Sequence, residues 1–470
     1  MATPNVTALA AQLRSTLKNS TVLTPDSEGY AQAIIRWSDE MEKRAGIVLY
    51  PETAEDISTA VLLSKEFSVP LAVCGGKHGS SGAASIEGGL QIDMGHMRNV
   101  SVDLSNNTAK VQGGCIWKDV DEAAAPHKLA MIGGTINHTG VAGLTLGGGY
   151  GWLTGRHGLT IDEVRAVTMV LADGRIVTAS SDENQDLFWA VRGAGHCFGI
   201  AVDFTFQLHP QENPVWSGQM LFPASKDLTT VVNFANNLVA TTDGASAMVM
   251  GITQPPFMQE PAVVTTVFHD GPEDEAREIF KPLLELNPKI NTTKVRPYVE
   301  QNSLMNGPVD YGNRKLSKGV PFTLPLDPNF VHSLVGELKK LHSQVEGSTK
   351  SIMLFEFFHM GKVLNPWQDM AHAIRGEHGQ VMIGPFWLKA EDDATVRSWA
   401  ADAAVVVRGE LERVNGKEVA DSIGEYGNYD AFLVDPRRIF GKNLPRLAEL
   451  KLKFDPENVF NRSYPLVASP

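Results

Sequence analysis

The pattern of apolar and polar residues near the start of the chain predicts a β-α-β unit. The apolar run 46–50 is typical of a buried strand, and Thr53 with Asp56 three residues later is typical of a capping box at a helix start. The small and apolar residues that follow have helical spacing: Ile57, Ala60, Val61, Ser64 and Phe67. A second strand is predicted over 69–73, and a glycine-rich turn follows it directly.

Short apolar runs bounded by Gly or Asp-Gly continue over 90–94, 109–112, 164–171 and 200–208, and they predict a mixed sheet. The proline-bounded segment 210–214 is the clearest break in composition. Beyond it, helices are predicted over 227–241, 273–286, 329–345 and 392–414. Strands are predicted between them, over 247–253, 262–268, 352–358 and 380–388. A length of 470 residues favours two to three domains.

The charge and cysteine content exclude several classes of protein. The chain has 54 acidic and 41 basic residues, and a net charge of −13 argues against nucleic acid or an anionic membrane as a partner. Three cysteines (Cys74, Cys115 and Cys197) are too few for a disulfide framework. Residues 1–13 lack the features of a signal peptide, and no segment reaches membrane-spanning length. We therefore expect a soluble cytoplasmic protein.

Two glycine-rich segments indicate a ligand site. Five glycines lie within 143–151, in a stretch otherwise apolar enough to be buried, so something must approach that backbone closely. The expected ligand is flat or polyanionic. In the turn after the second strand, Gly75, Gly76, Gly79 and Gly82 could leave successive N–H groups free to bind phosphates. An ordinary glycine-rich turn is the alternative for either segment taken alone.

Two common nucleotide motifs are excluded. No Gly-x-Gly-x-x-Gly follows a predicted strand, so a Rossmann dinucleotide site is poorly supported. A P-loop is equally poorly supported, because Gly76-Lys77 is followed by His78 and Leu71 stands where the first glycine of that motif is required.

An ordered series of short motifs runs through 44–210 and resumes near the C-terminus. They are Pro51-Glu52-Thr53, Gly75-Gly76-Lys77-His78, Gly88 to Asp93, Gly133-Gly134-Thr135, Gly140 to Leu153, Gly158 to Asp162, Ala172 to Arg175, Asp186 to Gly193, Phe198-Gly199-Ile200, Tyr426 to Asp430 and Leu447 to Phe460. The series resembles the FAD-binding domain of the vanillyl-alcohol oxidase and p-cresol methylhydroxylase superfamily. Within it, the chain is most similar to the berberine bridge enzyme-like oxidases, of the monocovalent, 6-hydroxynicotine oxidase-like type.

The resemblance implies an α+β fold of two domains. A discontinuous FAD-binding domain of the PCMH type would occupy 1–210, with its core at 44–210. A substrate-binding domain, an antiparallel sheet covered by helices, would be inserted at 211–424. Residues 425–470 would then return to the FAD domain.

The resemblance, together with the glycine pattern, implies which residues contact FAD. These are His78, Gly75, Gly76, Lys77, Gly79, Ser80, Gly134, Thr135, His138, Thr139, Gly140, Gly143, Gly147, Gly148, Gly149, Tyr150, Gly151, Gly199, Ile200, Asn428 and Tyr429. No metal is predicted, because His138, His157 and His196 have no zinc-ligand spacing.

The resemblance assigns His78 a covalent bond to the flavin 8α carbon, a bond that a neutral imidazole can form as a nucleophile. A loop histidine that only hydrogen-bonds is the alternative. Ile136 stands where many relatives have a second attachment cysteine, so a second link at that position is impossible. Thr139 occupies the position thought to gate oxygen, where a small residue favours an oxidase.

A base is needed opposite the flavin, and two residues compete for this role. Tyr426 matches the base of some relatives, and we expect Lys77 or Arg375 to lower its pKa. Glu356, in an aromatic strand, is the competitor; it is either solvent-facing, as alternation favours, or buried with a raised pKa. His359 and Arg375 are expected to line the same cavity.

Three functions stay open. The first is an FAD-linked oxidase that takes hydride from a C–O or C–N bond of a small organic substrate, with O2 reduced to H2O2. The substrate would be a secondary metabolite, alcohol or sugar. The second is a dehydrogenase with another electron acceptor, and the third is a flavin-bearing scaffold for a non-redox cyclisation. Fold does not decide among them.

Overall fold

The first sheet of the computed structural model, which describes residues 4–467, is built on the predicted β-α-β unit. Its strands are β1 (Thr21–Leu23), β2 (Ile47–Tyr50), β3 (Leu71–Cys74) and β4 (Leu90–Asp93). Their order is β1-β2-β4-β3, in which β2, β4 and β3 run parallel and β1 is antiparallel. β4 therefore separates the two strands of the predicted unit.

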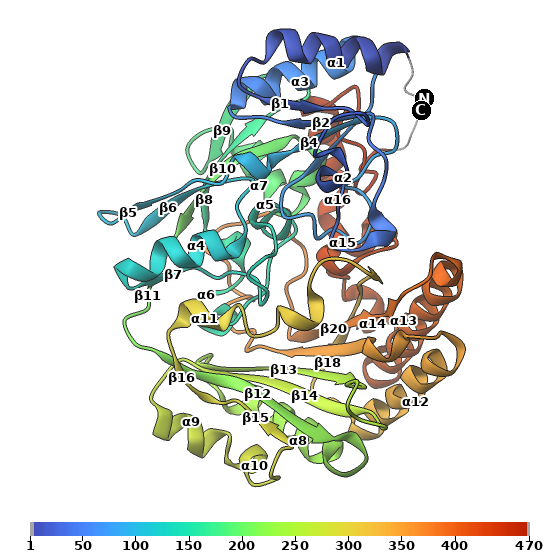
Figure 1. The fold of residues 1–470 in the computed structure, drawn as a ribbon. Helices are drawn as coiled ribbons and strands as arrows, with labels where there is room; N and C mark the ends of the chain where they lie inside the picture. The colour runs from blue at the N-terminus through green and yellow to red at the C-terminus, as the bar shows by residue number, and fades with distance from the viewer. Residues whose placement is uncertain (1–3, 468–470) are drawn as a thin grey trace.

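Helices α1 (Pro4–Thr16) and α3 (Ala54–Glu66) cover one face of this sheet (Figure 1). The predicted capping box at the start of α3 is confirmed. The Thr53 hydroxyl accepts a hydrogen bond from the Asp56 N–H at 3.1 Å, and the Asp56 carboxylate accepts one from the Thr53 N–H at 3.1 Å. Such a cap stabilises a helix by ~1 kcal/mol.

A second sheet has five antiparallel strands in the order β5-β6-β10-β8-β9. They are β5 (Val100–Asp103), β6 (Thr108–Gln112), β8 (Val164–Val170), β9 (Ile176–Ser180) and β10 (Ile200–Gln207). The prediction of one mixed sheet was therefore wrong. Apolar runs identify strands, but long-range pairing decides which strands share a sheet.

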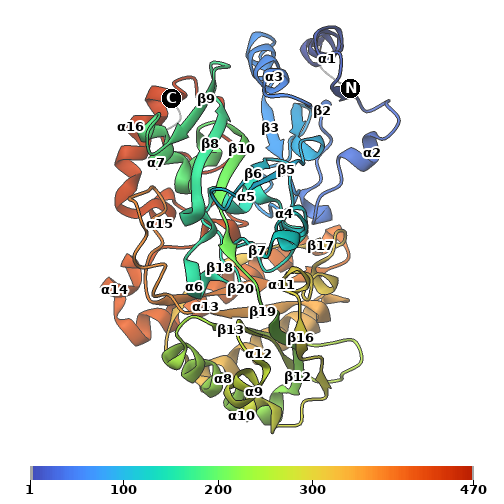
Figure 2. The same ribbon diagram turned by 90° about the vertical axis from the view of Figure 1, so that its left-hand side faces the viewer.

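Helices from both ends of the sequence pack with this second sheet in one core. They are α4 (Trp117–Ala124), α5 (Val141–Leu146), α7 (Gln185–Ala194) and α16 (Leu444–Phe454). Figure 2 shows α7 and α16 side by side. This packing supports a C-terminal return to the FAD domain, and the boundaries at 210/211 and 424/425 remain our proposal.

The third sheet is antiparallel and larger, with the order β15-β12-β14-β13-β19-β20-β18 and β16 beside β12. The strands are β12 (Val215–Pro223), β13 (Ser246–Thr253), β14 (Ala262–His269), β15 (Ile290–Asn291), β16 (Lys294–Arg296), β18 (Lys318–Thr323), β19 (Ile352–Phe357) and β20 (His378–Gly384).

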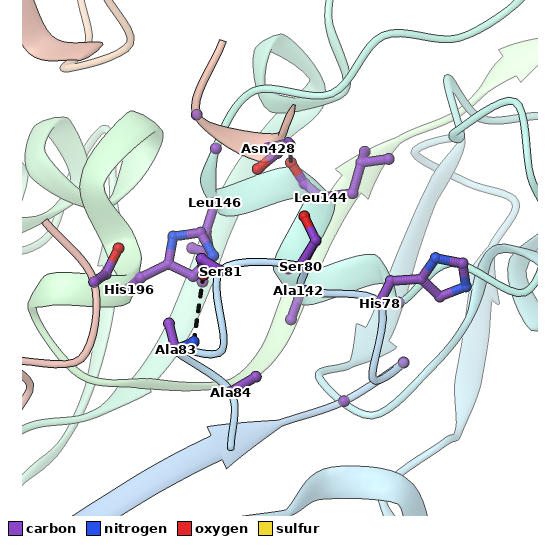
Figure 3. Close-up of a pocket in the computed structure, with 18 of the residues that line it drawn as sticks. His78, Ser80, Ser81, Ala83, Ala84, Ala142, Leu144, Leu146, His196 and Asn428 are labelled. Atoms are coloured by element: carbon purple, nitrogen blue, oxygen red, sulfur yellow. Dashed lines mark hydrogen bonds between the residues drawn. The ribbon is translucent and has the colours of Figure 1, made fainter. Parts of the chain in front are cut away.

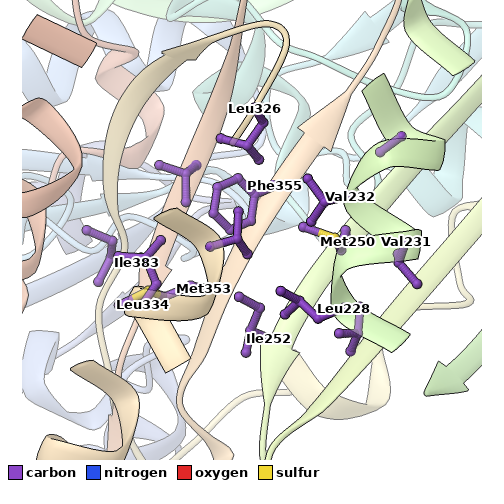
Figure 4. Close-up of a cluster of buried hydrophobic side chains, with 14 of the residues drawn as sticks. Leu228, Val231, Val232, Met250, Ile252, Leu326, Leu334, Met353, Phe355 and Ile383 are labelled. Carbon is purple, nitrogen blue, oxygen red and sulfur yellow. The ribbon is translucent and has the colours of Figure 1, made fainter. Parts of the chain in front are cut away.

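Helices α8 (Ala224–Thr241), α12 (Pro328–Gln344) and α13 (Asp393–Asn415) cover one face of the third sheet. Figure 4 shows their apolar side chains, such as Leu228 and Leu334, meeting Met250 and Phe355 of the strands. The opposite face packs on Tyr150, Trp152 and their neighbours from the predicted FAD-binding domain. Both faces are thus buried, and the predicted α+β architecture is confirmed.

Two predicted elements are each divided by a proline. The helix predicted over 273–286 is two helices, α9 (Glu273–Ile279) and α10 (Lys281–Leu284), with Pro282 in the first turn of the second. The strand predicted over 380–388 ends as β20 at Gly384, and β21 (Phe386–Trp387) joins a different sheet with β17 (Arg314–Lys315). Pro385 between them has no N–H for the ladder.

Within residues 4–467, no helix combines the length and apolar composition needed to cross a bilayer. Cys74, Cys115 and Cys197 are buried free thiols, and burial raises the pKa of Cys197 to about 11.

A buried ion cluster joins the third sheet to the C-terminal segment. Lys318 Nζ in β18 lies 2.6 Å from Glu425 Oε2 and 3.5 Å from Asp430 Oδ1. Arg438 Nη1 lies 2.7 Å from Glu425 Oε1, and the Tyr464 hydroxyl donates to Asp430 at 2.9 Å. These contacts bracket residues 426–429.

Removing the Lys318 ammonium should be strongly destabilising, because two carboxylates would stay buried with fewer partners. Lys318→Met should lower the free energy of unfolding by ~3–5 kcal/mol. Lys389→Met is the matched control, since the exposed Lys389–Glu346 pair (3.1 Å) is screened by solvent and should contribute little to stability. Thermal unfolding midpoints of the two variants measure the difference, and equal shifts would contradict the prediction.

Candidate functional site

A cavity of about 380 Å³ opens where the two halves meet. Four segments of the predicted FAD-binding domain line it: the turn after β3, the loop before α5, residues 193–201 and residues 460–464. The third sheet contributes Leu354 and Met382, and the C-terminal segment contributes residues 426–430. The cavity thus joins chain segments that are far apart in sequence.

The turn after β3 carries His78 and is held by Lys77. Lys77 has a φ of 61°, a left-handed conformation that costs of order 1 kcal/mol in a residue other than glycine. Its ammonium lies 2.8 Å from Asp93 Oδ2, a carboxylate that is fully buried. In Figure 3 the turn continues past Ser80 and Ser81, whose hydroxyl accepts from the Ala83 N–H at 3.3 Å.

The backbone of this turn is in direct contact with the backbone of the loop before α5. A Cβ atom on Gly76 would overlap the backbone of Gly140, and one on Gly140 would lie 2.5 Å from Gly76 N. The Tyr311 hydroxyl donates to Gly76 O at 2.7 Å. Only glycines permit this approach, which holds His78 and Thr139 in the wall of one cavity.

In the second glycine segment, protein atoms rather than a ligand approach most of the glycines. A Cβ on Gly147 would overlap the Asn428 amide, one on Gly148 would lie 2.7 Å from His372 Cε1, and Gly149 and Gly151 are crowded by Thr160 and Gly133. Gly143 differs: among the described residues, nothing lies within 4 Å of its Cβ position. The expected close approach to this backbone is present, but the approaching atoms belong mostly to the protein itself.

Most predicted cofactor residues line the cavity: Gly75, Gly76, Lys77, His78, Gly79, Ser80, Gly134, Thr135, Thr139, Gly140, Gly143, Gly147, Tyr150, Gly199, Ile200, Asn428 and Tyr429. Tyr426 lines it as well. Those that lie outside the lining are His138, Gly148, Gly149 and Gly151, together with Glu356.

The lining also includes residues that the sequence interpretation missed, above all His196 and His372. In Figure 3 His196 lies on the opposite side of the cavity from His78, and burial lowers its pKa to about 4. His372 packs on Gly148, and burial lowers its pKa to about 3. His196 stands between two quoted motifs and could have been found there, whereas nothing in the sequence near His372 indicates a site.

His78 makes one hydrogen bond through its ring, between its Nε2 and His138 Nδ1, which lie 2.7 Å apart. Burial, with smaller effects of His138 and Lys315, lowers the pKa of His78 well below its usual value. The imidazole is therefore neutral, and a neutral imidazole is the nucleophilic form.

Tyr426 does not have the cationic neighbour that was expected. Lys77 is paired with Asp93, and Arg375 is paired with Asp162 at 2.5 and 2.9 Å. The Tyr426 oxygen accepts from the Gly149 N–H at 3.0 Å and from Asn428 Nδ2 at 2.8 Å. Burial, Tyr150 and Glu356 nevertheless raise the Tyr426 pKa, so the expectation of a lowered pKa was wrong.

Glu356 is buried, with 3% of its surface exposed, because the third sheet is covered on both faces. The expectation of a solvent-facing carboxylate was wrong, and the buried alternative holds. Burial raises the Glu356 pKa to about 7. Its Oε1 accepts a hydrogen bond from the Tyr429 hydroxyl at 2.8 Å, and Tyr429 lines the cavity. His359 and Arg375 are not among the lining residues.

Histidines elsewhere form no metal centre. His157 stacks on His209, with ring centroids 3.7 Å apart. Across the described residues, no three His, Cys, Asp or Glu side chains are grouped to hold a metal ion.

Comparison with known proteins identifies two segments of this arrangement. A family model described as "FAD binding domain" matches residues 45–180, and one described as "Berberine and berberine like" matches residues 425–464. The FAD-linked oxidoreductase pgmH of Aspergillus terreus is 33% identical over 97% of this chain and 95% of its own. The chain belongs to the berberine bridge enzyme-like FAD-linked oxidoreductases.

Solved structures of this family share the fold. A structure of 6-hydroxy-D-nicotine oxidase from Arthrobacter nicotinovorans superposes with a TM-score of 0.81, at 24% identity over 96% of this chain and 98% of that one. Glucooligosaccharide oxidase from Acremonium strictum, described with a 6-S-cysteinyl, 8α-N1-histidyl FAD, gives 0.80 at 21% identity over 99% of each chain.

The cavity of this berberine bridge enzyme-like protein fits FAD. The uncrowded Gly143 leaves room for a flat ring system, and the turn around Gly79 and Ser80 lies in the same wall as His78. We therefore take these walls as the FAD cradle.

The contact between Gly76 and Gly140 predicts a loading defect. In Gly76→Ala, the methyl group would force the two loops apart, and FAD bound per chain should fall by ~10-fold or more. Gly409→Ala is the control: nothing lies within 4 Å of its Cβ position in α13, so it should bind FAD normally and be stabilised by ~0.5–1 kcal/mol. The ratio of flavin to protein absorbance measures loading, and a fully loaded Gly76→Ala would refute the cradle.

Proposed function

We propose that this FAD-dependent oxidoreductase is an oxidase. It would take hydride from a C–O or C–N bond of a small organic substrate and reduce O2 to H2O2. The observation that supports this most strongly is that His78, Thr139 and Tyr429 line a single cavity. The residues proposed for flavin attachment (His78), oxygen access (Thr139) and proton removal (Tyr429) would thus surround one ligand.

A single covalent link through His78 is part of the proposal. The His78 imidazole is neutral, and its Nε2 is engaged by His138. Ile136 also lines the cavity, and its side chain cannot form a thioether. Bound FAD would supply the hydride acceptor and return the electrons to O2.

Proton removal is assigned to Glu356 acting through Tyr429. Glu356 lies behind the cavity wall, and the Tyr429 hydroxyl bridges it to the cavity. As Tyr429 takes a proton from the substrate, it would pass its own to Glu356. Tyr426 is the weaker candidate because its hydroxyl, unlike that of Tyr429, has no hydrogen bond to a carboxylate. Its oxygen accepts from the Gly149 N–H and from Asn428 Nδ2, which suits it to orienting the substrate.

Thr139 supports O2 as the acceptor. Its side chain lines the cavity and is no larger than valine, so it leaves the path to the flavin open. The substrate end combines apolar side chains with phenols: Leu354, Met382, Met305, Tyr150, Tyr426 and Tyr429. This lining favours a largely apolar secondary metabolite or alcohol over a sugar, which would require many polar partners.

Substrate screening with a peroxide readout tests the oxidase proposal. Stoichiometric H2O2 would support it. Flavin that is reduced by substrate without peroxide would indicate a dehydrogenase, and flavin that stays oxidised under anaerobic substrate turnover would indicate a non-redox role.

The proposed covalent bond between His78 and the flavin predicts that the yellow colour remains in the pellet when the protein is precipitated with acid. In His78→Ala the colour should move to the supernatant, because no other side chain would hold the flavin covalently. His127→Ala, at an exposed histidine, should behave as the wild type. Colour released from the wild-type pellet would overturn the covalent assignment.

The base assignment predicts a pH dependence. Glu356 accepts a proton only when ionised, and its pKa is about 7, so kcat/KM should rise with pH through about 7 and then level off. Glu356→Gln should lower kcat by ~10²–10⁴-fold and abolish that rise. Glu346→Gln, at an exposed carboxylate, should change neither. An unchanged pH profile in Glu356→Gln would assign the base elsewhere.

A further inference from the structure

The His78 ring is held on several sides by side chains from distant parts of the chain. Trp37 stacks on it with centroids 5.4 Å apart, and Tyr311 meets it edge-on at 5.5 Å. His138 lies 4.8 Å away by centroids and makes the 2.7 Å hydrogen bond. The ring therefore has little freedom to turn.

His138 stands behind His78 and is not one of the cavity-lining residues, whereas its neighbours Ile136 and Thr139 are. Its Nε2 is buried and has no hydrogen-bond partner among the described residues. The hydrogen bond to His78 is the contact through which His138 can act on a ligand in the cavity.

The surroundings keep both imidazoles neutral. Burial lowers the pKa of each ring, and the Lys315 ammonium opposes protonation of both. Asp310 acts in the opposite direction on His138 only. Lys315 is held by the Asp310 carbonyl and by the Gly312 carbonyl at 2.7 Å, over the Trp37 ring. Because both rings are neutral, a single proton lies in the 2.7 Å hydrogen bond between His78 Nε2 and His138 Nδ1.

Two arrangements of that proton are possible, and only one leaves His78 with a nucleophilic ring nitrogen. If His78 donates from Nε2, its Nδ1 carries the free lone pair, and Nδ1 has no hydrogen-bond partner within residues 4–467. If His138 donates from its Nδ1 instead, the proton of neutral His78 lies on His78 Nδ1, and that nitrogen cannot attack.

We propose that His138 is the positioning base for flavin attachment at His78. It fixes the tautomer with a free Nδ1 and accepts the Nε2 proton as the bond to the 8α carbon forms. This rests on the single link proposed above. The loop that supplies a cysteine in doubly linked relatives would here supply the base for the single link, because Ile136 replaces that cysteine.

The proposed reaction is balanced with O2 as oxidant. The C–N bond replaces one C–H bond of the flavin 8α methyl group and one N–H bond of His78. Two protons are released, the one from His78 passing first to His138, and two electrons pass through the flavin to O2. The two electrons and two protons together convert O2 to H2O2.

The test follows attachment rather than turnover. Full-length protein from riboflavin-starved cells is incubated with FAD in air, and covalent flavin is followed by fluorescence on denaturing gels. His138→Ala should slow attachment by ~10²-fold, within the range for loss of a general base. Its affinity for FAD, from fluorescence quenching in a His78→Ala background, should stay within ~3-fold, and added imidazole should restore part of the attachment rate.

Further variants separate the possible failures. If His138→Ala does not fold, His138→Asn replaces it; its amide oxygen can accept the hydrogen bond but not the proton, so attachment should again be slow. His127→Ala should attach flavin at the wild-type rate. Wild-type protein that forms no covalent flavin would overturn the single link itself, whereas a linked wild type with unslowed His138 variants would overturn only the role of His138.

Discussion

The close contact between Gly76 and Gly140 is the constraint on which the site depends. Two loops that follow different strands can meet backbone to backbone only because neither residue has a Cβ atom. Lys77, in a left-handed conformation and paired with buried Asp93, fixes the turn on one side. His78 and Thr139 then flank the contact, so the position of the imidazole follows from packing rather than from its own hydrogen bond alone.

A second constraint places the substrate side of the site. Lys318 lies between Glu425 and Asp430, and this buried cluster joins the third sheet to the C-terminal segment on both sides of Tyr426 to Tyr429. The same arrangement brings the Tyr429 hydroxyl to Glu356 in the neighbouring strand β19. A carboxylate buried between two packed layers has a raised pKa, which suits it to accept a proton near neutral pH.

The sequence predicted local structural features well, but it predicted poorly which side chains pair with one another in the fold. The Thr53 capping box, the glycine turn before His78 and the long helices of the second half all depend on spacing within a few residues, and the structure contains them. The partners of Lys77, Arg375 and Glu356 depend on residues far along the chain, and each expectation about them had to be corrected. The grouping of strands into separate sheets was missed for the same reason.

By itself the sequence determined the family, the FAD-binding motifs and the absence of a cysteine at position 136, because these are properties of short, ordered runs of residues. Only the tertiary structure decided that Asn428 and His372, rather than a ligand, crowd Gly147 and Gly148, that Glu356 is buried, and that His138 lies behind His78. Crowding, burial and hydrogen bonding between distant residues arise when separate segments pack together, and no local pattern encodes the distance between two such segments.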